Sequence, residues 1–374
     1  MSQPPTSGTE PRVQVLTAPD GDVAARSWDA LPSTTAAVGG SAWVRAWLEV
    51  YGADSRPLAA VVGPADRPRA VLPLVRRRNR PWTAEVLGVR QLAEPTDVRA
   101  ADDASLRALV QAVAATRLPL RLKRLPADSP LLPHLREVYG RSALLLSRRV
   151  IGTPTISLDD SWLEPETHFS SRRRSDARAA RRRADRLGEV ELSVLEPAPG
   201  EVGPLFDEVV AVEGAGWKVA AGTALASQPQ MRAFFRRFCE LAAEQGALRL
   251  AFLRIDGRPV AVQVAVEQDG RYSLFKIGFD EEFARCSPGN LLMLHAVRWA
   301  AERGLTSFEF LGIEEPWTAL WTEQVRGCVE VQVYPLSGWS VPAAAEVGWE
   351  VATRAVRAGA RAAARRVRTT GSDT

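Results

Sequence analysis

The chain has 374 residues, of which 46% are apolar and 25% are charged, and its net charge is +4. This length is too great for one ordinary domain and suits two, and the composition is that of a globular protein with a substantial core. No run reaches the roughly 18 to 20 apolar residues of a membrane span, and MSQPPTSGTEPR lacks the features of a signal peptide. We therefore expect a cytoplasmic protein without stable membrane insertion, with residues 1–12 disordered.

Cysteine and histidine are scarce, and their spacing matches neither a disulfide framework nor a metal site. The chain has three cysteines without a CxxC motif and three histidines that lie far apart. This pattern fits a reducing compartment and predicts no bound metal. The residues are Cys239, Cys286, Cys328, His134, His168 and His295.

Strands and helices alternate in the first half. After a strand over 13–16, a helix begins near Ser41 and continues through Trp43, Trp47 and Val50. Short β-like runs follow, separated by turn signals such as GPADRP. The other expected elements are strands at 58–62, 70–75 and 83–89, a helix at 104–116 and a strand at 120–125. This order favours an α/β or α+β layer fold.

The stretch from about 126 to 165 is richer in proline, serine and aspartate, so we place the domain boundary there. An arginine-dense helix over 172–188 follows and is expected to end at Gly188. The remaining expected elements are a strand at 191–195, helices at 203–215 and 229–245, strands at 248–255, 259–267 and 271–279, a helix at 288–303 and a strand at 306–312. Because the two halves share one element order, we expect a duplicated architecture.

The second half contains a strand, a loop and a helix in the order that a phosphate-binding site needs. LFKIGFD ends the strand, EEFARCSPG forms the loop, and the helix follows. Pro288 suits an early helical position, and Gly289 allows a ligand to approach the backbone closely. The amides and dipole of such a helix end favour an anion, for which Arg285 is a second contact. An ordinary helix start is the alternative interpretation.

From about 165 to 325 the chain resembles the GNAT-type domain of CelD-like proteins of bacterial polysaccharide biosynthesis. The similar segments, in order, are RRRADRLG, EGAGWKVAAGTAL (213–225), DGRPVAVQ (256–263), FKIGFDEEFARCSPGNLL (275–292) and FEFLGIEEPWTALWTE (308–323). The first half resembles the partner region of these proteins more loosely, at SAWVRAWLEVYG, AVLPLVRRR and EPTD (94–97). Paired folds of this sort are also similar to Fem-type aminoacyltransferases of peptidoglycan synthesis.

The resemblance implies an α/β (α+β) protein with two tandem GNAT-like domains, each with a mixed central sheet flanked by helices. We expect a degenerate domain over 13–150, a GNAT acyltransferase domain over 151–340 and a basic Ala/Arg helical tail over 341–374. The implied activity is N-acetyltransfer, or transfer of another acyl group from acyl-CoA to an amine. The acceptor is expected to be a small molecule or saccharide, such as an amino sugar or an envelope-polysaccharide precursor.

The resemblance also implies site residues. The acyl-CoA pyrophosphate would lie on the loop of Arg285, Ser287, Gly289 and Asn290, beside splayed strands that expose an amide for the oxyanion. Asp280 and Glu309 are the candidates for the base or amine-orienting carboxylate. Trp217, Lys218, Lys276 and Trp321 are candidate substrate contacts. For the two tryptophans, an ordinary position in the core is an equally good interpretation.

Other residues have structural interpretations that compete with functional ones. His295 lies on an apolar helix face and is better explained as a core residue, and Cys286 has no histidine placed to activate it. The family has an aromatic-Lys pair where this chain has Trp317-Thr318. No tyrosine lies between 310 and 330 to serve as the acid, which stays unassigned.

The helix over 172–186 carries eight arginines and two aspartates. A solvated charged helix is one interpretation, and contact with an anionic polymer or tRNA is the other. The basic helix would serve the first alternative function, a Fem-like aminoacyltransferase that uses aminoacyl-tRNA. The missing tyrosine and the Trp317-Thr318 pair leave open the second, a non-catalytic GNAT-fold partner in polysaccharide or envelope assembly. Arginines recur every three or four residues in the tail, which allows transient contact with an acidic surface.

Overall fold

The computed structural model describes residues 11–15, 21–35, 37–64, 66–216 and 225–349. Residues 1–10 of the expected disordered segment and residues 350–374 of the expected basic tail lie outside this part, as do Trp217 and Lys218. Residues 340–349 are helical. No described helix is long and apolar enough to cross a bilayer.

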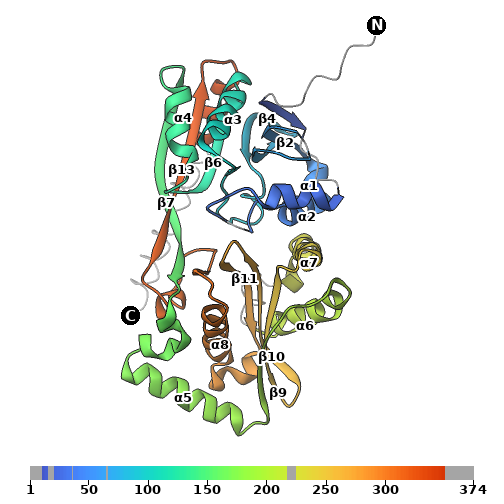
Figure 1. Cartoon of the computed structure of the whole chain (residues 1–374), viewed down its shortest axis with the longest axis vertical. Coiled ribbons are helices and arrows are strands. Elements are labelled where there is room, and N and C mark those ends of the chain that lie inside the picture. Colours follow the sequence, from blue (N-terminus) through green and yellow to red (C-terminus); the bar gives the residue numbers. More distant parts are fainter. Residues whose placement is uncertain (1–10, 16–20, 36, 65, 217–224, 350–374) are drawn as a thin grey trace, which may run out of the picture.

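The first half of the chain forms one sheet with helices packed against it (Figure 1). Its strands are β1 (Arg12–Val15), β2 (Ser55–Val62), β3 (Ala70–Arg77), β4 (Arg80–Val86), β5 (Arg99–Ala100) and β6 (Leu120–Pro126). Its helices are α1 (Gly21–Asp29), α2 (Ser41–Tyr51), α3 (Asp103–Ala115) and α4 (Leu131–Tyr139).

In the described part of the chain, the second half continues the same 13-stranded sheet and has its own helices. The strands from residue 143 onward are β7 (Ala143–Ser157), β8 (Val190–Leu195), β9 (Leu248–Ile255), β10 (Arg258–Gln268), β11 (Arg271–Phe279), β12 (Ser307–Glu309) and β13 (Val325–Pro335). The helices are α5 (Ser171–Asp185), α6 (Val202–Gly214), α7 (Pro229–Glu244) and α8 (Pro288–Glu302). Helix α5 thus ends before the expected Gly188, with Arg186 at its C-cap.

Both halves repeat one order of strand, two helices, three strands, helix and strand. Apart from the short β5, the first half has β1, α1, α2, β2–β4, α3 and β6, and the second has β8, α6, α7, β9–β11, α8 and β12. In each half the first four strands pair antiparallel in chain order, and the fifth pairs parallel with the fourth. The predicted fold class is therefore confirmed, with mixed sheets flanked by helices.

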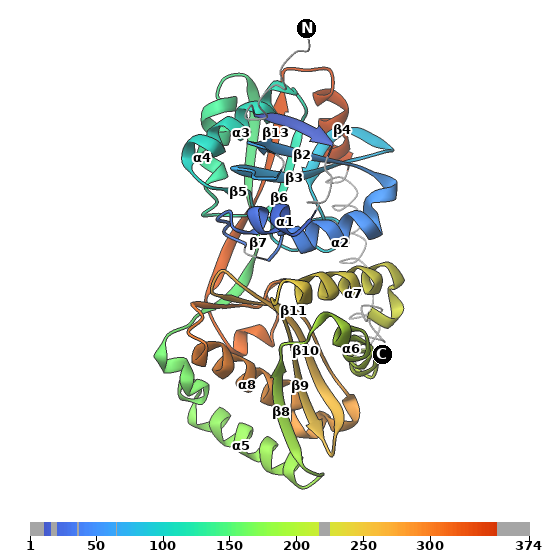
Figure 2. The same ribbon diagram turned by 45° about the vertical axis from the view of Figure 1, so that its right-hand side comes forward.

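Strands β7 and β13 join the two halves. Strand β13 lies between β6 and β7 in the sheet, so it belongs to the sheet of the first half. The far end of β7 pairs with β12 of the second half. Figures 1 and 2 show this two-stranded ribbon passing from one half to the other. Along it, Gly152 lies so close to the Arg326 carbonyl oxygen that a Cβ would not fit.

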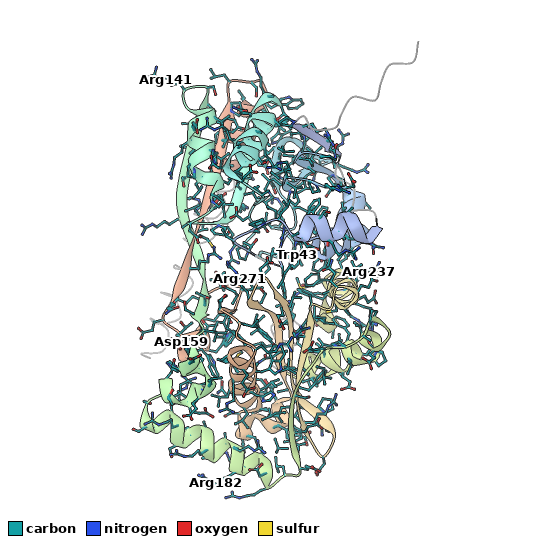
Figure 3. The ribbon with its side chains drawn as sticks, in the orientation of Figure 1. Trp43, Arg141, Asp159, Arg182, Arg237 and Arg271 are labelled. Carbon is teal, nitrogen blue, oxygen red and sulfur yellow. The ribbon has the colours of Figure 1, made fainter. Side chains whose placement is uncertain are left out.

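A continuous apolar core also crosses between the halves, where α2 packs on α7. The Trp43 ring lies 4.9 Å from Phe234 and 5.3 Å from Phe238 of α7, and 5.5 Å from Phe275 of β11. Figure 3 shows Trp43 at this junction. Burial of each such side chain stabilises by about 1.5–3 kcal/mol. A large apolar interface of this kind holds the two halves in a fixed relative position.

Candidate active site

A pocket of about 270 Å³ lies beside the N-terminal end of α8. It is enclosed by the end of α6, by β10 and β11, by the loop that precedes α8 and by two tryptophans of the segment after β12. The lining residues are Glu213, Gly216, Val262, Gln263, Ile277, Gly278, Phe279, Ala284, Ser287, Pro288, Gly289, Asn290, Leu292, Met293, Trp317 and Trp321.

The pocket opens where two parallel strands diverge. The register pairs Arg271–Ser273 of β11 only with Ser307–Glu309 of β12, and β11 then continues to Phe279. Its last residues, 277–279, line the pocket. Beyond Ser273 this side of β11 has no further β12 pair, and the pocket lies beside it.

A bulge in β11 turns Lys276 away from this pocket. Val264 pairs with Lys276 and Ala265 with Leu274, so Phe275 is the extra residue. The Lys276 ammonium lies 4.6 Å from the centroid of the Phe235 ring on α7. Burial raises the pKa of Glu94 of the first half. The charge of Lys276 is close enough to oppose this rise in part. Lys276 therefore faces the first half and is not among the lining residues.

The loop before α8 is a 3-10 turn over Glu281–Cys286, followed by Ser287 in a left-handed conformation with φ of +46°. Ser287, Gly289 and Asn290 of the expected phosphate loop line the pocket, whereas Arg285 does not. The Arg285 side chain is exposed, and its carbonyl oxygen accepts a hydrogen bond of 2.6 Å from Arg183 of α5. Cys286 is buried beneath the loop.

The two expected catalytic carboxylates lie outside the described lining of the pocket. Asp280 accepts hydrogen bonds from the Glu282 amide at 3.0 Å and from Arg258 at 2.6 Å, so it caps the turn that begins the loop. Glu309 accepts a hydrogen bond from Ser307 at 2.9 Å and has Arg271 at 3.8 Å. Its side chain faces a small cavity between the halves.

Two polar residues that sequence reasoning did not single out do line the pocket. Glu213 is 1% exposed, and its Oε2 accepts a hydrogen bond of 2.9 Å from the Leu225 amide. Gln263 is 2% exposed; its Nε2 contacts Met293 Sδ at 3.7 Å, and its Oε1 has no hydrogen-bond partner in the described part of the chain. Gln263 is a polar residue within the apolar segment PVAVQVAVE, and this feature of the sequence could have identified it as a candidate.

The tryptophans after β12 complete the wall. Trp321 is buried and meets the Phe169 ring edge-on at 5.4 Å. Trp317 meets Phe310 at 5.7 Å and lines the same pocket. Their indoles supply part of the apolar lining, which suits an apolar or planar part of a ligand.

His295 does not occupy the expected core position. It lies half-buried on the face of α8 toward α5, in a groove on the far side of that helix from the pocket. Burial, with a smaller effect from Arg298, lowers its pKa, so the imidazole is neutral at pH 7.

Comparison with known proteins finds a similarity in the segment that contains this site. Residues 171–318 match the acetyltransferase (GNAT) domain family. The matched residues contain α5, the diverging strands, the loop and α8, and every lining residue of the pocket except Trp321. No curated protein matches the chain in sequence.

Several solved structures share the fold over most of the chain. FemX is 11% identical, with a TM-score of 0.55 over 87% of this chain and 97% of its own. A conserved protein of unknown function from Bacteroides thetaiotaomicron is 11% identical, with a TM-score of 0.55 over 86% and 99%. The C-terminal domain of a protein described as a lysylphosphatidylglycerol synthetase from Agrobacterium fabrum is 15% identical, with a TM-score of 0.52 over 82% and 89%. At these identities the similarity shows the fold alone.

Proposed function

We propose that the GNAT domain transfers an acyl group, such as acetyl, from acyl-CoA to an amine in the pocket beside α8. The observation that carries the proposal is the cavity at the start of α8, beside the part of β11 that continues beyond its last β12 pair. A β11 amide placed there can stabilise the oxyanion of the thioester carbonyl as it is attacked. The start of α8 provides backbone amides and a positive dipole end for the pyrophosphate.

The matching helix of the first half supports assigning the activity to the second half. Helix α3 begins after Asp102, whose carboxylate accepts a hydrogen bond of 2.7 Å from the Ser105 amide, and Asp103 lies in its first turn. Two carboxylates there repel a phosphate. At the start of α8, Ser287 makes no side-chain cap and the first turn has no acidic residue. We infer that only the α8 end is suited to an anion, which fits a degenerate first domain.

Glu213 is the carboxylate whose position best suits the acceptor amine. It lines the pocket together with the backbone of β11, so a cationic amine that enters would lie between them. In the reaction the amine nitrogen forms a bond to the acyl carbon and the carbon–sulfur bond breaks. Glu213 first takes one proton from the cationic amine, which frees the nitrogen lone pair for attack, and the second proton that the nitrogen loses passes to the departing CoA thiolate. Asp280 and Glu309, the original candidates, then serve as supports of the loop and of β12.

Gln263 is suited to hold an amide or hydroxyl group of a ligand. Its buried Oε1 without a partner has a desolvation cost that a ligand N–H or O–H would remove. The pantetheine arm of CoA carries amide N–H groups, and an amino sugar carries hydroxyls. The resemblance to proteins of polysaccharide biosynthesis favours an amino sugar or envelope-polysaccharide precursor as the acceptor.

The first test is thermal unfolding of the full chain with acetyl-CoA, in the wild type and in Gly289→Leu. A Cβ on Gly289 makes only an ordinary contact, at 3.5 Å from Phe279 Cδ1, so leucine there keeps the fold and fills the pocket. Ligand at about 100 times its Kd should stabilise the wild type by roughly 2.7 kcal/mol. Gly200→Leu is the control, because Gly200 has no neighbouring atom within 4 Å. An equal shift in Gly289→Leu would place the ligand elsewhere.

The exposed arginines of α5 favour a second candidate, transfer of an aminoacyl group from aminoacyl-tRNA. The helix presents Arg172, Arg178 and Arg182 to solvent. This candidate predicts tight tRNA binding that weakens steeply with salt, and no stabilisation by acetyl-CoA. Stabilisation by acetyl-CoA without turnover on any amine would instead indicate a non-catalytic GNAT-fold partner.

A further inference from the structure

A second cavity, of about 390 Å³, lies between α5 and α8, on the other side of α8 from the pocket. Neighbouring residues of α8 face the two spaces: Leu291 lines this groove, whereas Leu292 and Met293 line the pocket. The size is within the range of small-molecule sites, which is about 300–1,000 Å³. The groove is therefore large enough for a ligand of its own.

The groove is lined by an excess of positive charge. Four guanidinium groups line it, from Arg174, Arg178, Arg181 and Arg298, against the single carboxylate of Glu166. Like charges that share one concave surface repel each other, and the surface concentrates their field. Burial has the largest effect on the pKa of His295, and the positive charge of Arg298 has the second largest; both lower it. A lowered pKa is what a positively charged surrounding produces.

Three of the four arginines are held in place by protein groups. Arg298 donates to Glu166 at 2.8 Å and 3.0 Å and to the Leu163 carbonyl at 3.1 Å. Arg174 donates to the Phe169 carbonyl at 2.8 Å, and Arg181 donates to Asp185 at 2.7 Å. These bonds fix the side chains at the groove and leave other N–H groups of each guanidinium for a ligand.

Arg178 differs from these three. Within the described part of the chain its guanidinium has no hydrogen bond or ion pair, although it lines the groove between Arg174 and Arg181. The floor below is apolar, with Ala177 of α5, Leu192 of β8 and Leu294 of α8. A ligand that fits carries a compact oxyanion for the arginine forks and an apolar or aromatic part for the floor.

We propose that the α5–α8 groove is a second binding site, which takes the phosphate of an organic phosphate ester. The phosphate could come from the nucleotide end of acyl-CoA or from a separate phosphorylated metabolite, and the chemistry of recognition is the same. The site does not depend on acyl transfer, since it requires only the groove and its arginines.

The test is calorimetric titration of the full chain with inorganic pyrophosphate, without acyl-CoA. We expect saturable binding to the wild type and about tenfold weaker binding to Arg178→Gln, which loses a charge-assisted contact. Arg182→Gln is the matched control: Arg182 is exposed on the same helix, is absent from the groove lining and projects at the far end of the molecule (Figure 3). It should bind as the wild type does.

Three results would overturn the proposal. The first is that the wild type does not bind pyrophosphate. The second is that Arg178→Gln and Arg182→Gln weaken pyrophosphate binding equally. The third is that Gly289→Leu loses pyrophosphate binding whereas Arg178→Gln keeps it. The last would place the anion at the start of α8. If acyl transfer fails in a protein that still binds pyrophosphate in the groove, only the proposed function is lost.

A second pair of titrations separates the two sources of phosphate. If CoA binds more tightly than 3′-dephospho-CoA and Arg178→Gln removes the difference, the donor's own phosphate occupies the groove. If pyrophosphate binds unchanged to protein saturated with CoA, the groove takes a separate phosphorylated ligand. Either result supports the site.

Discussion

Gly278 of β11 lies directly against the backbone of Glu213, at the end of α6. A Cβ on Gly278 would be 2.8 Å from Glu213 Cα, and a Cβ on Gly216 would be 2.8 Å from the Phe279 carbonyl oxygen. These two glycines let α6 and β11 approach closely enough for the Glu213 carboxylate to reach the pocket. The contact therefore links a packing requirement to the position of the proposed base.

Gly278→Ala should destabilise the fold and displace Glu213. The added methyl group meets backbone, which cannot move aside as a flexible side chain does, so we expect a loss of about 1–3 kcal/mol. Urea unfolding measures the loss, and the acyl-transfer rate should fall with it. Gly200→Ala, at an open position, should leave both unchanged. A fully stable Gly278→Ala variant would mean that α6 and β11 are not held this closely.

Glu213→Gln should slow acyl transfer by about 10²–10⁴-fold while acyl-CoA binding persists, because the amide cannot accept the proton of the amine. Its Oε1 can still accept the Leu225 hydrogen bond. The measurements are kcat, from release of the CoA thiol, and Kd for acyl-CoA. Asp280→Asn and Glu309→Gln are the comparison. A large loss of kcat in either of these, with none in Glu213→Gln, would return the role of base to that residue.

Gln263→Leu should have opposite effects on stability and binding. Leucine removes a buried amide oxygen without a partner, so the ligand-free protein should gain about 1–3 kcal/mol of stability. Ligand affinity should fall because its donor loses an acceptor. Thermal unfolding with and without acetyl-CoA measures both effects, and Gln268→Leu, at the less buried end of β10, is the control. Unchanged affinity for acetyl-CoA would exclude Gln263 as a contact of the acyl donor.

Glu330→Gln should lower stability in a pH-dependent way. Burial raises the pKa of Glu330, but the hydrogen bond and charge of Arg121, with bonds from Gln332 and Arg148, outweigh it, so the pKa is lowered. Arg121 Nε is 2.8 Å away, and both side chains are buried. At pH 7 the variant removes the negative charge beside the Arg121 guanidinium and keeps only an amide oxygen as an acceptor, at a cost of about 1–3 kcal/mol.

The stabilisation from Glu330 is present above its unfolded pKa and is lost as the pH falls through the lowered, folded one. The difference between wild type and variant should therefore shrink below about pH 4.5. Urea unfolding across this range measures it, with the exposed Glu191→Gln as the control. A difference that stays constant with pH would exclude an ionised Glu330 as its cause.

Local patterns predicted most of the elements that surround the pocket. The strand over 271–279 agrees with β11, and the helix over 288–303 agrees with α8 to within one residue. Alternating or continuous apolar residues and a proline at the helix start define both segments, so tertiary contacts were not needed to find them. The loop position was found for the same reason.

Neither β7 nor β13 was expected, and both depend on long-range pairing. Strand β7 lies in the stretch chosen as the boundary, and its first part is largely exposed, which weakens the apolar signal. Strand β13 does alternate in VEVQV, but its partners β6 and β7 lie far away in the sequence. Likewise, the arginine that holds Asp280 comes from another strand, so its cap role was not evident from sequence.

The place of β13 has a consequence for synthesis. On the ribosome, residues 12–126 emerge long before Val325–Pro335, yet the sheet that they form needs that last strand between β6 and β7. The first half cannot complete its sheet while the second half is being translated, and the neighbouring edges of β6 and β7 stay open during that time. A chain truncated after β12 would therefore lose a strand of the opposite half, and the two halves should not be separable as independently expressed fragments.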